Sequence, residues 1–435
     1  MNIVFYGIVV IAFVFTGYRQ LTWNPDSAAS VAPMQALATG MIESAKSSVT
    51  LAIGLIGVMA LFLGLMKIAE AGGLLQIIAR LVRPLMVRLF PDVPAEHPAM
   101  GAMIMNMSAN ALGLGNAATP FGIRAMQALD SLNPNKGTAT NAMALFLAIN
   151  TSSVTLLPTG VIALRASVGS IDPAGIVPTT LFATFCSTTV AIIAAKSYQR
   201  LSRNVPISGE SDTDTADEIA IESSTDTPEL PPSAEGAYPE WVSYAALFGI
   251  TALIPLAVIY GAAVGPWIVP GMMLLLLSFG LVRGVSVYES FVEGARDGFQ
   301  VAVRIIPYLV AILVAVGMLR ESGALHVFTD ALGALTSAVG LPGEALPMAL
   351  LRPLSGSGAY GILAATIQDP AIGPDSYVGY LVSTLQGSTE TTFYVIAVYF
   401  GAVQVRRVRH ALAAGLTADL AGIIGAVAAC WYLYA

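Results

Sequence analysis

The stretch Asn106-Met-Ser-Ala-Asn-Ala-Leu-Gly-Leu-Gly-Asn116 is the most informative part of this sequence. It lies in an otherwise apolar region, yet it carries three Asn, one Ser and two Gly. A straight membrane-spanning helix would leave these amides facing lipid, which is energetically expensive. A broken segment can use them, because irregular backbone at membrane depth is tolerated where it is buried in protein or lines a cavity. The stretch therefore predicts a re-entrant hairpin.

The composition is that of a polytopic membrane protein. The 435 residues are 56% hydrophobic and only 11% charged, whereas an average soluble protein has about a quarter of its residues charged. The formal net charge is −7, but the segment Asn204–Glu240 holds ten acidic residues and no Lys or Arg. The rest of the chain is therefore slightly basic. Cys186 and Cys430 both lie in apolar runs, which argues against a disulfide framework or a cysteine metal site.

Apolar runs of about 20 residues are long enough to cross a bilayer, and they predict about nine spans. The expected spans are Met1–Tyr18, Ser48–Met66, Asn141–Leu164, Pro178–Ala195, Val242–Ala262, Ile268–Val282, Val301–Leu319, Tyr377–Ala402 and Ala411–Tyr432. The first of these lacks the basic region and cleavage site of a signal peptide, so we expect it to be retained. Amphipathic helices are expected at the membrane interface over Ala32–Lys46, Leu74–Phe90 and Leu325–Val339.

A second interruption, Pro353-Leu-Ser-Gly-Ser-Gly-Ala-Tyr-Gly361, matches the first. Aligning Ser108 with Ser355 places Asn110 on Ser357. Three more pairs follow the same order: Glu43–Lys46 with Glu293–Arg296, Glu70–Leu74 with Glu321–Leu325, and Asn150–Ser153 with Gln386–Thr389. The predicted fold is an all-α integral membrane protein with two repeats, each containing a re-entrant hairpin and an interrupted transmembrane helix. The predicted units are a first repeat over 1–198, an acidic disordered linker over 199–239, and a second repeat over 240–435.

Counting the spans predicts that the two repeats have opposite orientations in the membrane. The counterpart of the first span is the sixth, so the second repeat begins on the other face. With Met1 inside, fifteen Lys and Arg residues fall on the cytoplasmic face and four on the other, in line with the positive-inside rule. This orientation places the acidic linker in the cytoplasm and the C-terminus outside, in the inner membrane of the cell.

These motifs resemble a known group of membrane proteins. The first half, with Asn106 to Pro120, is similar to spore maturation protein A, and the second, with Arg352 to Gly358 and Gln386 to Tyr394, is similar to spore maturation protein B. Both belong to the nucleoside-recognition or Gate domain family, which resembles parts of concentrative nucleoside transporters and of the bacterial ferrous-iron permease. The resemblance implies an inner-membrane protein with a transporter-like core, and by analogy a homo-oligomer. It does not select a substrate.

Polar residues at the interruptions are the candidate substrate-binding residues. They are Asn106, Ser108, Asn110, Asn116, Asn150, Thr151, Ser152, Ser153, Ser355, Ser357, Gln386, Ser388, Thr389 and Glu390. Unwound helices expose carbonyls and side chains that hold substrates or ions in transporters. The alternatives are that the Asn residues cap broken helix ends and that the hydroxyls form ordinary hydrogen bonds between helices.

Two carboxylates are candidates for coupling a cation. An ionisable group within a membrane span is a functional hypothesis by default, and Glu390 and Asp419 both lie within predicted spans. Glu390 is expected to bind a cation, accept a proton or meet a substrate amine; its structural alternative is an ion pair with Arg352. The coupling ion is expected to be Na⁺ or H⁺, with no cofactor and no metal site.

The sequence favours a cation-coupled secondary transporter of a small polar organic solute, with a nucleoside-like solute among the candidates. It has no Walker A motif and no His-Glu-x-x-His motif, so neither nucleotide-driven transport nor zinc hydrolysis is indicated. The expected partners are the solute and the lipid bilayer, and no nucleic acid. The alternative is a non-transporting membrane scaffold for envelope or cell-wall processes, in which the linker binds the partner. An intramembrane hydrolase is a weaker third class, and the chain is not expected to be an enzyme.

Overall fold

The computed structural model describes residues 2–24, 31–113, 115–152, 155–201, 238–325, 327, 333 and 336–435. The part of the chain within these ranges is helical and contains no β-strand. Four of its helices are long and apolar enough to cross a membrane: α2 (Pro33–Ala71), α8 (Ile176–Leu201), α10 (Val287–Glu321) and α16 (Ala411–Tyr434). Each contains one of the predicted spans. The all-helical membrane class is therefore confirmed.

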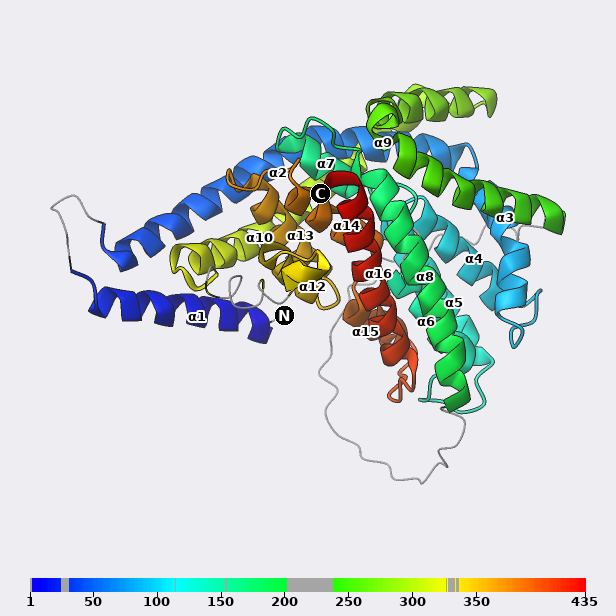
Figure 1. The fold of residues 1–435 in the computed structure, drawn as a ribbon. Coiled ribbons are helices and arrows are strands. Elements are labelled where there is room, and N and C mark those ends of the chain that lie inside the picture. The colour runs from blue at the N-terminus through cyan, green and yellow to red at the C-terminus, as the bar shows by residue number, and fades with distance from the viewer. Residues whose placement is uncertain are drawn as a thin grey trace.

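The helices α2 and α10 pack against each other along most of their length (Figure 1). Gly40 of α2 lies beside Glu321 at the end of α10, and Gly64 lies beside Phe291 near its start, so the two helices are antiparallel. The helix α1 (Asn2–Leu21) packs on α10. The expected interfacial helix over 32–46 is not separate, since α2 runs through it into the predicted span. No Pro lies between Pro33 and Ala71 to interrupt its hydrogen bonds.

Each half of the chain contains a helical hairpin followed by a broken helix. In the first half, α4 (Pro98–Ala111) and α5 (Gly115–Ser131) form the hairpin, and α6 (Asn141–Ser152) and α7 (Thr159–Ser167) form the broken helix. In the second half these elements are α12 (Leu346–Leu351), α13 (Gly356–Gln368), α14 (Tyr377–Ser388) and α15 (Thr392–Gly401). The breaks fall where the sequence predicts interruptions. Pro158, which lacks an N–H donor, ends the first break.

The helices α8 and α16 pack side by side near the middle of the molecule (Figure 1). The hydroxyl of Ser187 in α8 donates to the carbonyl of Ala418 in α16 at 2.9 Å. Gly425 of α16 lies against Ala183, so these two helices are also antiparallel. Both α6 and α14 pack against this pair. The broken helices of the two halves therefore pack on the same pair of helices, α8 and α16.

The helix α9 (Glu240–Val282) contains both expected spans, Val242–Ala262 and Ile268–Val282, within one bent helix. Glu240 pairs with Arg88 at the end of α3 (Leu74–Leu89), whereas Arg283, just after α9, donates to the carbonyl of Gly72, just before α3. A straight helix of 43 residues would be about 65 Å long, and α3 is only about 24 Å long. The helix α9 must therefore double back, as Figure 1 shows.

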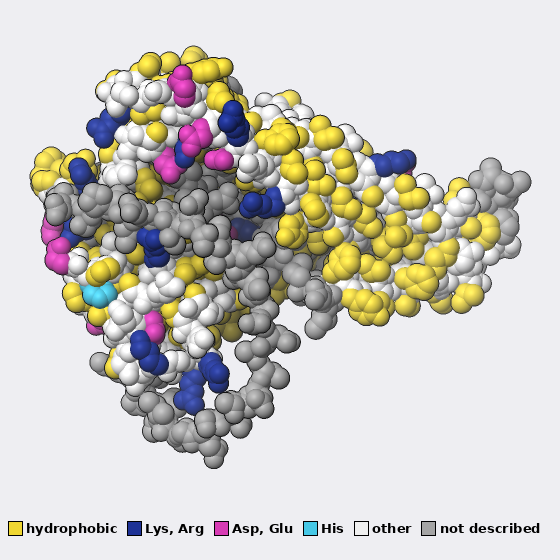
Figure 2. All heavy atoms as spheres, turned by 180° about the vertical axis from the view of Figure 1, so that it is seen from behind, with side chains coloured by type: hydrophobic (Ala, Val, Ile, Leu, Met, Phe, Trp, Pro, Cys, Tyr) yellow, Lys and Arg dark blue, Asp and Glu magenta, His cyan; other side chains and the backbone are white. Residues whose placement is uncertain are grey.

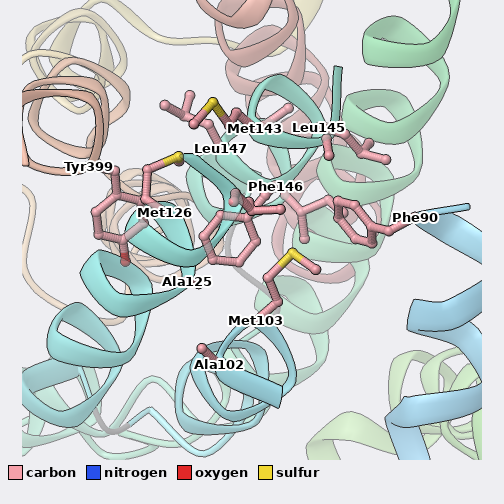
Figure 3. Close-up of a cluster of buried hydrophobic side chains, with 14 of the residues drawn as sticks. Phe90, Ala102, Met103, Ala125, Met126, Met143, Leu145, Phe146, Leu147 and Tyr399 are labelled. Carbon is pink, nitrogen blue, oxygen red and sulfur yellow. The ribbon is translucent and has the colours of Figure 1, made fainter. Parts of the chain in front are cut away.

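The largest apolar core surrounds α6 and joins it to α3, α4, α5 and α15. Phe146 of α6 is fully buried and stacks on Tyr399 of α15, with 6.1 Å between ring centroids. Figure 3 shows Phe146 among Met103 of α4, Met126 of α5 and Tyr399. The second half thus contributes an aromatic ring to the core of the first.

The outer surface of the arm formed by α1, α2 and α10 is apolar. Figure 2 shows hydrophobic side chains spread over this part of the molecule, with most of the charged side chains elsewhere. Phe13 and Val14 of α1 are among its exposed large apolar residues. Such a surface is stable against lipid but not against water, which agrees with a membrane location for these helices.

Candidate functional site

A cavity of about 370 Å³ lies where the two halves meet. Its walls come from α2 and α10, from the tips of both hairpins, and from the breaks in both interrupted helices. Five of its polar lining residues are Asn110, Arg352, Ser357, Gln386 and Glu390. Four of these were predicted as binding residues from sequence, and Arg352 was predicted only as the partner of Glu390. The structure therefore brings both interruptions to one place.

Glu390 is held in place through its backbone and presents its carboxylate to the cavity. Its N–H donates to the carbonyl of Thr151 at 2.8 Å, so the break of α14 is bonded to the end of α6. Its side chain is 46% exposed and lies 3.7 Å from the guanidinium of Arg352. Arg352 is buried and donates to the carbonyl of Thr389 and the hydroxyl of Thr391. The ion pair that was the structural alternative for Glu390 is present, but its separation is long.

The Asn residues of the first hairpin form a buried hydrogen-bond network. The side-chain nitrogen of Asn110 donates to the side-chain oxygen of Asn150 at 3.0 Å. Asn106 donates to the hydroxyl of Tyr399 at 3.2 Å and to the carbonyl of Ala118 at 2.7 Å. The hydroxyl of Tyr399 lies 3.4 Å from the same oxygen of Asn150. Of the three Asn residues in this network, only Asn110 also lines the cavity.

The N-terminus of α13 opens on the cavity. Ser355 caps this helix, since its hydroxyl accepts a hydrogen bond from the N–H of Gly358 at 3.0 Å. Gly356 and Ser357, the first two residues of the helix, both line the cavity. The ring of Tyr360, one turn further on, also lines it, and its hydroxyl donates to the carbonyl of Gly160 across the interface between the halves.

Asp419 lies in α16 and is 4% exposed. The hydroxyl of Thr392 donates to one of its carboxylate oxygens at 2.6 Å. Its other oxygen has no hydrogen-bond partner among the described residues. Asp419 and Arg352 are bonded to neighbouring residues, Asp419 to the hydroxyl of Thr392 and Arg352 to that of Thr391. The candidate coupling carboxylate is therefore next to the polar cluster, although it does not line the cavity.

The other predicted residues are buried beside the cavity and bond to protein. The hydroxyls of Ser108, Thr151, Ser152 and Ser388 each donate to a backbone carbonyl one turn earlier in the same helix. Thr389 contributes its backbone carbonyl to Arg352. The side chain of Asn116 and the whole of Ser153 lie outside the described residues. These four hydroxyls bond to the backbone of their own helix, and Ser152 also donates to the hydroxyl of Thr188 in α8, which is the interhelical bonding given as the alternative.

Several lining residues were not predicted from the sequence. They are Met59, Thr155, Thr159, Tyr308 and Tyr360, together with apolar neighbours. Met59 and Tyr308 sit in long apolar helices, where nothing in the local sequence separates a residue facing a cavity from one facing lipid. The central crossing of α2 and α10 determines which of these residues meet the breaks.

The cavity between the two interrupted helices lies within segments that match a protein-family model. Residues 52–167 and 302–406, half of the chain, match a family described as Gate: Nucleoside recognition. The chain belongs to the Gate family. All of the cavity-lining residues fall within these two Gate segments, whereas α8, α16 and Asp419 lie outside them.

Curated relatives support the same assignment. The chain is 43% identical over 198 residues to spore maturation protein A of Bacillus subtilis, covering 46% of this chain and 95% of that protein. It is 46% identical over 162 residues to spore maturation protein B of the same organism, covering 37% of this chain and 88% of that protein. These matches are consistent with a fusion of an A-like and a B-like Gate unit. No solved structure matches the chain.

Proposed function

We propose that this Gate protein is a cation-coupled secondary transporter of a small polar organic solute in the cytoplasmic membrane. The observation that supports this is the cavity itself: its largely apolar wall carries a few charged and polar side chains, it lies between two helix breaks, and it takes its walls from both Gate segments. Discontinuous helices that meet at a shared site are the usual construction of secondary transporters. The volume of about 370 Å³ is at the small end of ligand pockets, which span about 300–1,000 Å³.

The charges beside the cavity support coupling to a cation. The buried cation Arg352 lies 3.7 Å from the carboxylate of Glu390, and a second carboxylate, Asp419, is bonded to Thr392, the residue after the Thr391 that accepts from Arg352. One negative charge is then left without a partner at membrane depth, where an unpaired charge is costly. A proton or a sodium ion would neutralise it. The burial of Asp419 and its carboxylate oxygen that has no partner among the described residues make Asp419 the stronger candidate for that ion. The half-exposed carboxylate on the cavity wall makes Glu390 the stronger candidate for the solute.

We also propose an inverted repeat with about nine spans, the N-terminus and the acidic segment 199–239 in the cytoplasm, and the C-terminus outside. The antiparallel packing of α2 with α10, and of α8 with α16, is what an in-plane pseudo-twofold axis would produce. The packing is not symmetric, however: α2 contacts α7, whereas α10 contacts α13. Exchanging the conformations of the two repeats would create a second arrangement of the same contacts, which is the basis of alternating access.

The alternative is a non-transporting scaffold. The names of the two curated relatives refer to spore maturation and not to transport. A scaffold needs no titratable group in the cavity, and its partner would be bound elsewhere, for example by residues 199–239. The two functions differ in which change abolishes activity in the cell: loss of the Glu390 carboxylate for a transporter, or removal of 199–239 for a scaffold.

The thermal stability of the purified protein tests the proposal. A ligand that binds only the folded state raises the melting temperature by mass action. Nucleosides, amino acids, dicarboxylates and metal ions would be screened with and without sodium, and a hit would then be followed as uptake into proteoliposomes. Glu390→Gln and Asn110→Ala should abolish the shift. Glu96→Gln, which removes an 88% exposed carboxylate outside the cavity, should not. Well-folded protein that neither binds nor transports any of these solutes would contradict a transporter.

A further inference from the structure

The cavity carries two opposite charges side by side. The guanidinium of Arg352 and the carboxylate of Glu390 approach to 3.7 Å. A tight charge-assisted hydrogen bond has a length of about 2.7–2.9 Å, so these two groups are near each other without being fully paired. Both line the cavity. A ligand that meets both charges therefore does not have to break a strong bond between them.

The positive side of the site is reinforced by α13. The hydroxyl of Ser355 accepts a hydrogen bond from the N–H of Gly358. The N–H groups of Gly356 and Ser357 donate no hydrogen bond to any of the described residues. Free N–H groups at a helix N-terminus favour an anion. Arg352 adds a full charge, and its buried Nε has no hydrogen-bond partner within the described chain. A side chain on Gly356 would come within 3.4 Å of Arg352 and 2.9 Å of Thr391, so the backbone here approaches the guanidinium closely.

The negative side of the site consists of hydrogen-bond acceptors. Glu390 supplies a half-exposed carboxylate. The side-chain oxygen of Gln386 is buried on the cavity wall without a partner among the described residues. Asn110 uses its nitrogen to donate to Asn150, which leaves its oxygen as an acceptor. A carboxylate with two amide oxygens suits a group that only donates hydrogen bonds, such as an ammonium.

Resting on the transporter function proposed above, we propose that the solute is a small zwitterion of the α-amino acid type. Its carboxylate lies at the N-terminus of α13 beside Arg352, and its ammonium lies at Glu390. The adjacent positions of the two protein charges match the adjacent charges of an α-amino acid. Such a solute adds no net charge, so the single unpaired negative charge remains for the coupling cation. An uncharged solute would leave both sides of the site without a charged partner.

The test compares matched ligands on the wild-type protein. All twenty amino acids are screened by melting temperature, with uridine and adenosine as uncharged competitors. For any amino acid that binds, its carboxamide (which lacks the carboxylate) and its des-amino acid (which lacks the ammonium) are measured by calorimetry. Each should bind at least about tenfold more weakly, since each loses hydrogen bonds to a charged group. This comparison does not depend on any variant folding.

Variants show which protein residue binds the carboxylate of the ligand and which binds its ammonium. In Arg352→Gln, the parent amino acid and its carboxamide should bind with similar affinity, and in Glu390→Gln the parent and its des-amino acid should do so. Arg320→Gln removes a guanidinium that pairs with Asp369 outside the cavity and should keep the wild-type ranking. A nucleoside that binds in an Asn110-dependent way while no amino acid does would overturn the zwitterion and keep the transporter. If no solute binds or is transported, the transporter itself fails.

Discussion

The N–H of Glu390 donates to the carbonyl of Thr151 at 2.8 Å, across 239 residues of sequence. This bond joins the break in α14 to the end of α6. Each break is also bonded to the hairpin of its own half, through Leu156 to Ala111 and through Phe393 to Pro353. We therefore expect a shift of one hairpin to move both breaks and the carboxylate of Glu390. This arrangement links the cavity wall to movements of either half.

The first prediction concerns Asp419. Asp419→Asn keeps the shape of the side chain and an acceptor for Thr392 but removes the charge. We expect solute binding in the wild type to depend on pH or on sodium concentration, and in Asp419→Asn to lose that dependence. Calorimetric titrations over a grid of pH and sodium concentrations measure it. Thr392→Val, which removes the hydroxyl and keeps the carboxylate, is the matched control and should retain the dependence. An unchanged dependence in Asp419→Asn would place coupling elsewhere.

The second prediction concerns the crossing of α2 and α10. A Cβ on Gly298 would lie 2.7 Å from backbone atoms of Met59 and Ala60. Gly298→Ala should therefore destabilise the protein by about 1–3 kcal/mol, the usual range for overpacking. Gly57→Ala in α2 meets no atom within 4 Å and should be neutral or slightly stabilising. Melting temperatures of the two purified variants decide the matter, and equal values would show that the two helices separate readily.

The third prediction concerns Arg165, which joins the two halves near the end of α7. It is fully buried, donates to Asp375 at 3.0 Å and to the carbonyl of Pro374, and lies 4.2 Å from the ring centre of Tyr380. Arg165→Ala should cost about 3–5 kcal/mol, because it leaves buried acceptors and a carboxylate unpaired. Arg320→Ala breaks a partly exposed pair and should cost less than about 1 kcal/mol. Thermal unfolding in detergent compares them; a small effect at Arg165 would mean that this contact opens in the resting state.

The fourth prediction concerns orientation. Ile171 is 90% exposed in the loop before α8, and Asn135 is exposed in the loop between α5 and α6. In a Cys186→Ser background, a membrane-impermeant thiol reagent should label Ile171→Cys in intact cells. It should label Asn135→Cys only after the cells are permeabilised. The reverse pattern would invert the proposed topology.

Much of the architecture follows from local sequence. The low charge content and the long apolar runs require a helical membrane protein, because only helices or closed barrels satisfy the backbone in lipid. Clusters such as Asn150–Ser153 and Gln386–Thr389 predict broken helices at the observed positions. Polar side chains in the middle of a span cost free energy, unless the helix breaks there and they bond to its freed backbone groups or line a cavity. Gln386 and Glu390 were placed at a site for the same reason. These predictions depend on residue chemistry and spacing alone.

The tertiary structure decides which residues line the cavity. Asn106 and Asn110 are equivalent by sequence, yet packing of Tyr399 from the other half directs Asn106 into a buried network and leaves Asn110 at the wall. Tyr308 lies in an apolar helix and gives no local signal, and it reaches the cavity only because α10 crosses α2 beside both breaks. A sequence can show where a helix must break, because helical hydrogen bonds join residues that are close in the sequence. Which side chains then face the space between the breaks depends on how distant helices pack.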